Sequence, residues 1–218
     1  MDLQVIARNL EFMAGGLVVT FEITAVALAG GLLWGILLGL GRLSRIPWIY
    51  HPVTVYVHFF RSQPLILVIF WFYFLVPVMI GKPLGAFVST LIAFVAFEAA
   101  YFAEIVRGGV QSVSGGQAAA GYSCGLRYHQ VQLYIILPQA LRNMLPALTT
   151  QAVVIFQDTS LAYVIGLREF LRRVNLVDTR EARSIELYLF AGTVYLVLCS
   201  LGSAAARRLE RRREVGLS

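Results

Sequence analysis

The sequence is short of charged residues. Only 14% of its 218 residues are charged, whereas an ordinary soluble domain has about 25%. Hydrophobic residues make up 58% of the chain, against roughly 45–50% in soluble domains. This combination excludes an ordinary soluble domain and is typical of a chain that faces lipid.

The sequence also lacks the common catalytic and metal-binding motifs. It has no Gly-x-x-x-x-Gly-Lys-Ser/Thr phosphate loop, no Gly-x-Ser-x-Gly turn and no His-Glu-x-x-His. His51, His58 and His129 do not have the spacing of a metal site. Cys124 and Cys199 form no Cys-x-x-Cys pattern. We therefore expect no enzyme activity, metal or cofactor in this chain, so any ATP that drives it must be bound elsewhere.

The net charge of +6 does not indicate nucleic-acid binding. The arginines gather at the ends of apolar runs, where membrane insertion places them. The N-terminus lacks the basic start of a cleavable signal, and the apolar run from Gly15 to Gly41 exceeds a signal's roughly 7–15 residues. We expect a resident membrane protein without nucleic-acid partners.

Apolar segments long enough to cross about 30 Å of hydrocarbon recur along the chain. The predicted spans are residues 15–40, 64–80, 85–106, 139–167 and 187–206. Five crossings leave the segment 1–14 outside and the basic tail 207–218 in the cytoplasm. The predicted fold class is therefore an all-α integral membrane bundle of five transmembrane helices.

The segments between these spans carry further signals. Residues 47–63 are rich in aromatic residues and predict an interfacial helix that ends at Pro64, because proline lacks the N–H that continues a helix. With five spans the arginine-rich segment 168–186 lies outside, against the positive-inside tendency. That tendency is set mostly by other loops and by the first helix.

Two local patterns predict contacts. The first span carries a stripe of small residues that would allow another helix to approach closely, namely Gly30, Gly31, Gly35 and Gly39. In the third span, Glu104 and Arg107 are spaced i, i+3, so they can pair on one helix face.

The stretch from Gln117 to Pro138 is weakly apolar and lies between strongly apolar segments. Its start favours helix, while Gly121 and Gly125 weaken or turn it. The sequence predicts two short helices with a bend at Gly125, lying at the membrane surface. Pro138 would begin the next helix, where its missing N–H costs nothing.

This stretch resembles the coupling loop of the permeases of ABC importers. The family pattern is Glu-Ala-Ala, three residues, Gly, nine residues and then Ile-x-Leu-Pro. Gly125 takes the place of the family's glycine, and Ile135, Leu137 and Pro138 take the place of its Ile-x-Leu-Pro end. Where the family has Glu-Ala-Ala, this chain has Ala119, Ala120 and Gly121. The resemblance implies that these residues transmit force from an ATPase: Ala119, Ala120, Gly121, Gly125, Leu126, Ile135, Leu137 and Pro138.

The resemblance extends from Gly15 to the tail, and it is to the branch that imports polar amino acids. The segments Phe97 to Tyr101, Ala103 to Arg107, Ile136 to Arg142 and Gln157 to Leu161 carry it. It implies an ABC type I importer permease in a bacterial inner membrane, with the N-terminus outside. The implied partners are a second permease subunit (a paralogue or a copy), two ATPase subunits that bind ATP and Mg, and a periplasmic solute-binding protein.

Polar residues in apolar surroundings are candidates for the substrate path: Arg61, Glu98, Gln157, Asp158, Thr159 and Ser160. Arg61 could bind a carboxylate with its guanidinium fork, or could be an arginine that reaches the membrane interface. Glu98 could line a substrate or proton path, or could be protonated or paired within the bundle. The cluster at Asp158 could line the path, or could satisfy backbone groups freed by a kink at Pro146.

The resemblance implies acidic amino acids, glutamate and aspartate, as the substrates. Another polar amino acid remains an alternative: glutamine, histidine, arginine or cystine. A proton-coupled carrier that uses Glu98 is a second alternative, although the inverted repeats that would support it are not visible. A non-transporting membrane scaffold is the third.

Overall fold

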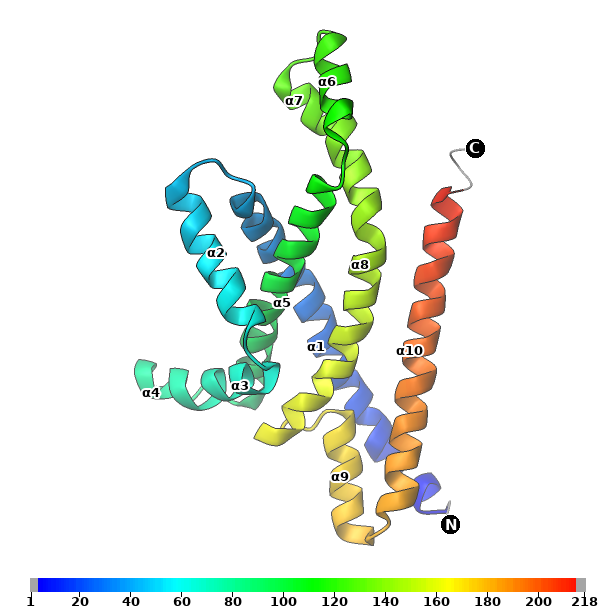
Figure 1. Cartoon of the computed structure of the whole chain (residues 1–218). Coiled ribbons are helices and arrows are strands. Elements are labelled where there is room, and N and C mark those ends of the chain that lie inside the picture. Colours follow the sequence, from blue (N-terminus) through cyan, green and yellow to red (C-terminus); the bar gives the residue numbers. More distant parts are fainter. Residues whose placement is uncertain (1–3, 215–218) are drawn as a thin grey trace.

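The computed structural model describes residues 4–214, and this part of the chain is helical and contains no strand (Figure 1). The α-helices are α1 (Gln4–Arg42), α2 (Pro47–Arg61), α3 (Leu65–Phe70), α4 (Val76–Ile80), α5 (Ala86–Gln111), α6 (Gly115–Ser123), α7 (Tyr128–Val131), α8 (Leu137–Asp158), α9 (Phe170–Glu181) and α10 (Ser184–Glu214). Two π-helical turns, η1 (Trp71–Leu75) and η2 (Gln132–Ile136), and a 3₁₀ segment, η3 (Thr159–Ile165), lie between them. The predicted all-α class is confirmed.

Three of the described helices are long and apolar enough to cross a membrane by themselves: α1, α5 and α10 up to Arg208. A fourth crossing is possible where α2 and the segment Leu65–Ile80 form one broken unit. Helix α8 is not in this group, because polar side chains such as Gln139, Arg142 and Asn143 follow its start. The predicted count of five spans therefore stays a prediction.

The broken unit bends by 105° between Arg61 and Leu65. Pro64 precedes α3 in an extended conformation, as the sequence predicted for this break. Helix α2 runs alongside α5, while the segment from α3 to α4 extends sideways away from the bundle (Figure 1). The side chain of Tyr56 fixes the first arm by donating a hydrogen bond to the carbonyl oxygen of Ala96 at 2.8 Å. This contact places α2 against α5, and the predicted interfacial position of 47–63 stays a prediction.

Helices α1 and α5 form the centre of the bundle through the predicted glycine stripe. A Cβ atom built on Gly31 would lie 2.9 Å from Cβ of Glu98, and one on Gly39 would lie 2.8 Å from Cβ of Val106. At Gly35 an added Cβ would collide with the side chain of Phe102. Only glycine therefore permits this helix separation, and the predicted close contact is confirmed.

The two π-helical turns each end two residues before a proline. In η1 the N–H of Val76 bonds to the carbonyl of Trp71, and Pro77 follows; in η2 the N–H of Leu137 bonds to Gln132, and Pro138 follows. A proline ring clashes with the carbonyl one α-helical turn earlier. The wider π turn makes room for that ring, so each helix continues through its proline.

The arginine-rich segment forms the helix α9, which the sequence did not predict, and it packs on the start of α1. The Nη1 atom of Arg173 donates to the carbonyl oxygen of Phe12 at 2.9 Å, and Nη2 of Arg180 donates to Oδ1 of Asn9 at 3.2 Å. Both guanidinium groups also lie over the ring of Phe12. These arginines hold α1 and α9 together. In the described residues α1 begins at Gln4, eleven residues before the predicted membrane span starts at Gly15.

The side chain of Glu169 caps the N-terminus of α9 just after the predicted fourth span. It is buried and accepts hydrogen bonds from the backbone N–H groups of Leu171 at 2.8 Å and Arg172 at 2.6 Å. Burial raises the pKa of Glu169 to about 7, while the two N–H donors oppose this by favouring the carboxylate. The folded protein therefore binds a proton here that the unfolded chain releases near pH 4.3.

Because this pKa is raised on folding, we expect stability to be greatest in acid and to fall as pH rises through about 7. The loss should be at most about 3 kcal/mol between pH 4.5 and 8. Thermal unfolding in detergent at several pH values measures it, and Glu169→Gln should flatten the profile. A wild-type melting temperature that rises across this range, with the same profile in the variant, would contradict the assignment.

Candidate functional site

The stretch between α5 and α8 projects from one end of the bundle as an elbow (residues 115–138). Helix α6 and the segment formed by α7 and η2 fold against each other at the top of Figure 1. Gly121 is buried at their contact, where an added Cβ would lie 2.6 Å from Cδ1 of Ile135 and 3.0 Å from Cγ2 of Val131. The two arms therefore pack through a glycine, in agreement with the predicted pair of short helices.

The bend is made by Gly125, as predicted, through a Schellman ending of α6. Gly125 has a φ of +80°, a region that side chains with a Cβ rarely adopt. Its N–H bonds to the carbonyl of Tyr122 at 2.9 Å, and the N–H of Leu126 bonds to the carbonyl of Gly121 at 3.1 Å. The glycine is thus required by backbone conformation, and nothing lies within 4 Å of an added Cβ.

The base of the elbow is braced between α5 and α8. The Nδ2 atom of Asn143 donates to Oγ of Ser112 at 2.8 Å, and Gly109 lies against the side chain of Met144. The elbow is therefore attached at its base to both helices.

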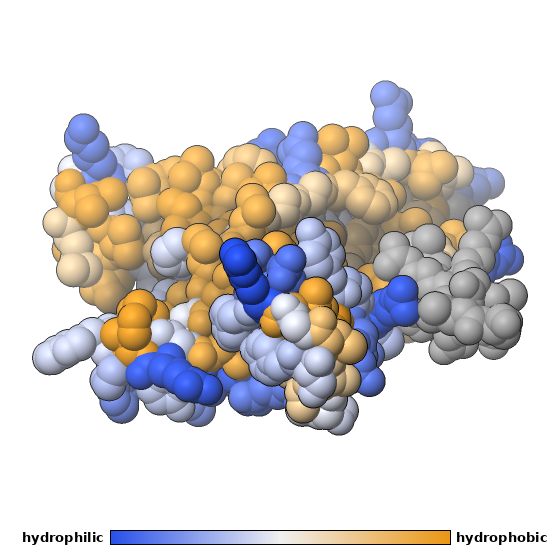
Figure 2. Space-filling model, turned by 90° about the horizontal axis from the view of Figure 1, so that it is seen from above, coloured by the Kyte–Doolittle hydropathy of each residue, from blue (hydrophilic) through white to orange (hydrophobic). Residues whose placement is uncertain are grey.

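The elbow exposes residues that the sequence analysis singled out and others that it missed. Ala119, Ala120, Gly125 and Leu137 are exposed; Leu126, Ile135 and Pro138 are half-buried. The missed residues are exposed aromatic and aliphatic side chains: Tyr122 (45%), Tyr128 (70%), Leu133 (54%) and Tyr134 (71%). Seen from this end, hydrophilic side chains gather on the projecting elbow and hydrophobic ones flank it (Figure 2). Large hydrophobic side chains that are exposed on a polar projection indicate a docking surface. This pattern is the signal by which the missed residues could have been found.

Glu98 is buried in the bundle centre and is paired. Its Oε2 accepts a hydrogen bond from Nε2 of Gln151 in α8 at 2.8 Å. Among the two interpretations from sequence, pairing within the bundle agrees with this contact. The sequence could not identify Gln151, which lies more than fifty residues away along the chain.

Arg61 lies at the end of α2 and is also paired. Its Nη1 lies 3.5 Å from Oε2 of Glu104, and its guanidinium group lies 5.4 Å from the ring centre of Tyr101. Glu104 also forms the predicted pair with Arg107, at 2.7 Å, and an unpredicted one with Arg42, at 3.2 Å. Arg61 thus has an ion-pair contact at one terminal nitrogen and a side chain that is 41% exposed, and its role toward a substrate stays a prediction.

The residues from Gln157 to Ser160 lie at the other end of α8. Thr159 is buried and donates to the carbonyl oxygen of Phe156 at 2.8 Å. Gln157 and Ser160 line a cavity of about 330 Å³ together with Tyr188 and Tyr195 of α10. In α8, the hydroxyl groups of Thr149 and Thr150 each donate to the carbonyl oxygen of Pro146 at 2.9 Å. The predicted path residues thus fall into separate places, at Arg61, at Glu98 and at 157–160.

Comparison with known proteins identifies the class. Residues 31–215 match the family described as "Binding-protein-dependent transport system inner membrane component", and the chain belongs to this family. It is therefore an inner-membrane permease component, in agreement with the resemblance found in the sequence.

Particular relatives cover nearly the whole chain. The glutamate/aspartate import permease protein GltK of Escherichia coli O157:H7 is 41% identical, over 97% of each chain. The probable glutamine ABC transporter permease protein GlnP of Bacillus subtilis (strain 168) is 33% identical, over 94% of this chain and 95% of its own.

Solved structures show the same permease fold. An amino acid ABC transporter crystallised with histidines has a TM-score of 0.92 at 28% identity, and covers 97% of this chain and 99% of its own. The MetNI methionine ABC transporter in an inward-facing conformation has a TM-score of 0.71 at 19% identity, with the same coverage. The fold is therefore that of ABC type I importer permeases.

Proposed function

We propose that this chain is the permease subunit of an ATP-driven importer of amino acids, with L-glutamate and L-aspartate as its substrates. The similarity to GltK at 41% identity over 97% of the chain supports these substrates. The elbow is the single structural observation that carries the coupling role. It projects from the bundle, exposes apolar side chains and is braced to α5 and α8.

The proposed partners follow from this role. An ATPase dimer that holds ATP and Mg would grip the elbow, because the chain has no phosphate-binding loop of its own. A second permease, either a paralogue or a copy, would complete the path, and a periplasmic binding protein would deliver the amino acid. The elbow and the end of α10 lie at one end of the molecule, and the start of α1 and α9 at the other (Figure 1). We assign the elbow end to the cytoplasm and the end with α9 to the periplasm, with five membrane crossings in all.

The proposed mechanism is a rigid-body alternation of access. When the ATPase subunits close on ATP, they displace the elbow, and the braced helices α5 and α8 tilt with it. Gly121 and the turn at Gly125 make the elbow a compact lever, since its two arms contact each other directly.

Reconstitution of the complete complex in vesicles tests this function. We expect ATP-dependent accumulation of labelled glutamate, and unlabelled aspartate should compete more strongly than glutamine, histidine, arginine or cystine. Uptake that continues without ATP but stops when the proton gradient is collapsed would indicate the carrier mechanism instead. Stronger competition by glutamine than by aspartate would indicate that glutamine, and not an acidic amino acid, is the substrate.

A further inference from the structure

Glu104 lies where three helices meet near the elbow end of the bundle. Its Oε1 lies 3.2 Å from Nη2 of Arg42 in α1, and its Oε2 lies 3.5 Å from Nη1 of Arg61 in α2. In its own helix α5, Arg107 donates to Oε2 from Nη2 at 2.7 Å and from Nε at 3.1 Å. One carboxylate thus holds guanidinium groups from three helices; we name these four residues the Glu104 cluster.

The Glu104 cluster contains three positive charges and one negative charge, so every attraction within it involves Glu104. Three guanidinium groups surround one carboxylate, so removing a single arginine leaves Glu104 with two partners. Removing the carboxylate leaves three cations that repel one another. The side chain of Arg42 is only 9% exposed, so its repulsion is weakly screened, whereas Arg61 and Arg107 are 41% and 30% exposed and are screened more. Without Glu104 the ends of α1 and α2 lose their electrostatic attachment to α5.

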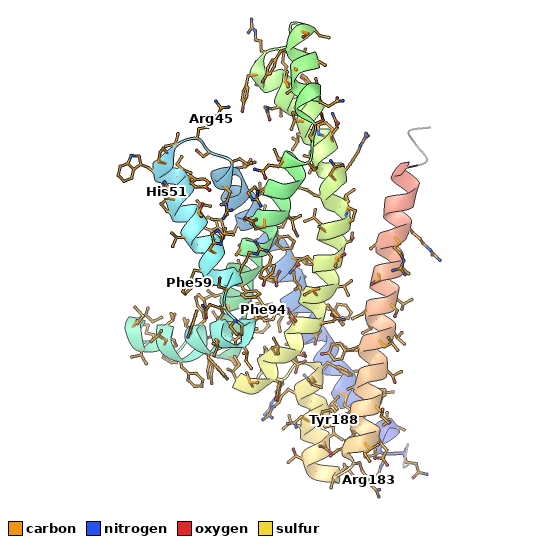
Figure 3. All side chains as sticks on the ribbon, in the orientation of Figure 1. Arg45, His51, Phe59, Phe94, Arg183 and Tyr188 are labelled. Carbon is orange, nitrogen blue, oxygen red and sulfur yellow. The ribbon has the colours of Figure 1, made fainter. Side chains whose placement is uncertain are left out.

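The Glu104 cluster is continuous with the base of the elbow. Arg107 also donates to Oε1 of Gln111, the last residue of α5. The next residue, Ser112, accepts the hydrogen bond from Asn143 that braces α8. The elbow begins three residues later, at Gly115. Arg45, which follows α1, lies at this end of the molecule, and Arg183 lies at the opposite end (Figure 3).

We infer that Glu104 is a positioning residue that makes α1 and α2 move together with α5 when the elbow is displaced. It acts through the arginines that it pairs with on α1, α2 and α5. This inference rests on the proposed function, because it requires that the elbow receives the force of an ATPase. It adds that the force reaches the two N-terminal helices through one carboxylate.

The test is Glu104→Gln, which keeps the shape of the side chain and removes its charge. In vesicles with the complete complex, substrate-stimulated ATP hydrolysis and amino-acid uptake are measured on the same preparation. We expect hydrolysis to continue while uptake falls, so that ATP consumed per amino acid rises about tenfold, within the range by which one residue of a coupling network acts. Glu104→Asp keeps the charge on a shorter side chain and should give an intermediate ratio.

A matched control is Glu181→Gln, because Glu181 also pairs with an arginine, Arg8 at 3.9 Å, at the other end of the molecule. This control should leave the ratio unchanged. A second readout is the distance between spin labels at the exposed residues Ile46 and Leu141, with Cys124 and Cys199 replaced by serine. Glu104→Gln should broaden this distance distribution, since the ends of α1 and α2 lose their ion pairs to α5.

An assembled Glu104→Gln complex with the wild-type ratio and distance distribution would overturn the inference. If that variant does not assemble, Arg61→Gln is tested instead, because Glu104 keeps two partners in this variant. We expect the ATP consumed per amino acid to rise about threefold. An unchanged value would overturn the inference. Failure of ATP-dependent uptake in the wild type is a different result, and it would contradict the proposed function itself.

Discussion

Replacing Gly125 by valine is expected to abolish most of the substrate-stimulated ATP hydrolysis of the assembled transporter while membrane insertion stays normal. The φ of +80° at Gly125 is required to end α6 and to direct the chain into α7. For a β-branched residue this conformation costs roughly 1–3 kcal/mol. The turn would therefore reopen and the elbow would lose the shape that the ATPase subunits grip. We expect at least about a tenfold loss, which corresponds to 1.4 kcal/mol.

The control for this prediction is Gly115→Val in the same elbow. At both glycines nothing lies within 4 Å of an added Cβ, but only Gly125 has a positive φ. The pair separates added bulk from backbone conformation. Gly125→Asn should be milder than valine, because asparagine tolerates the left-handed region. Equal activity of the Gly125→Val and wild-type complexes would show that the turn does not set the coupling surface.

Replacing Gly35 by valine is expected to separate α1 from α5 and to prevent stable folding. An added Cβ at Gly35 would collide with Phe102, and it would lie 3.0 Å from the carbonyl oxygen of Ala99 and 3.2 Å from the nitrogen of Ala103. Two of these neighbours are backbone atoms, which cannot move aside as a flexible side chain can. Overpacking usually costs about 1–3 kcal/mol, and we expect the upper end of that range or more. Thermal unfolding in detergent and the yield of monodisperse protein measure the effect.

Gly192→Val in α10 provides the matched comparison. Gly192 also lies in a long apolar helix, but nothing lies within 4 Å of its added Cβ. Gly192→Val should change the free energy of unfolding by no more than about 0.5 kcal/mol, as a substitution at an exposed site does. If Gly35→Val unfolds at the same temperature as Gly192→Val, then the glycine stripe does not set the distance between α1 and α5.

Contacts between residues that are close in sequence could be predicted, because helical geometry alone brings them together. The pair of Glu104 and Arg107 follows from an i, i+3 spacing. The bend at Gly125 follows from the tolerance of glycine for positive φ. The stripe that includes Gly35 follows from helical periodicity.

Contacts between distant residues could not be predicted in the same way. Nothing in the sequence relates Glu98 to Gln151, or Glu104 to Arg42 and Arg61, since each pair depends on how whole helices pack. The packing of residues 47–63 is another example. Their aromatic composition suits both a membrane surface and a helix–helix contact, and only the structure shows that Tyr56 contacts α5. The predicted interfacial position stays a prediction.

The sequence by itself determined that the chain is a membrane protein, that its elbow turns at a glycine, and that it resembles ABC-importer permeases. These properties depend on composition, periodicity and local spacing. Only the tertiary structure decided which polar residues are already paired and which surface the elbow presents. For Arg61 and Glu98 the sequence left a substrate contact and a structural role open, and the structure shows that each has a partner on another helix. The physical reason is that a polar group shielded from water needs a partner, and the partner of Glu98 is Gln151 on another helix, which only the packing of α5 and α8 brings near.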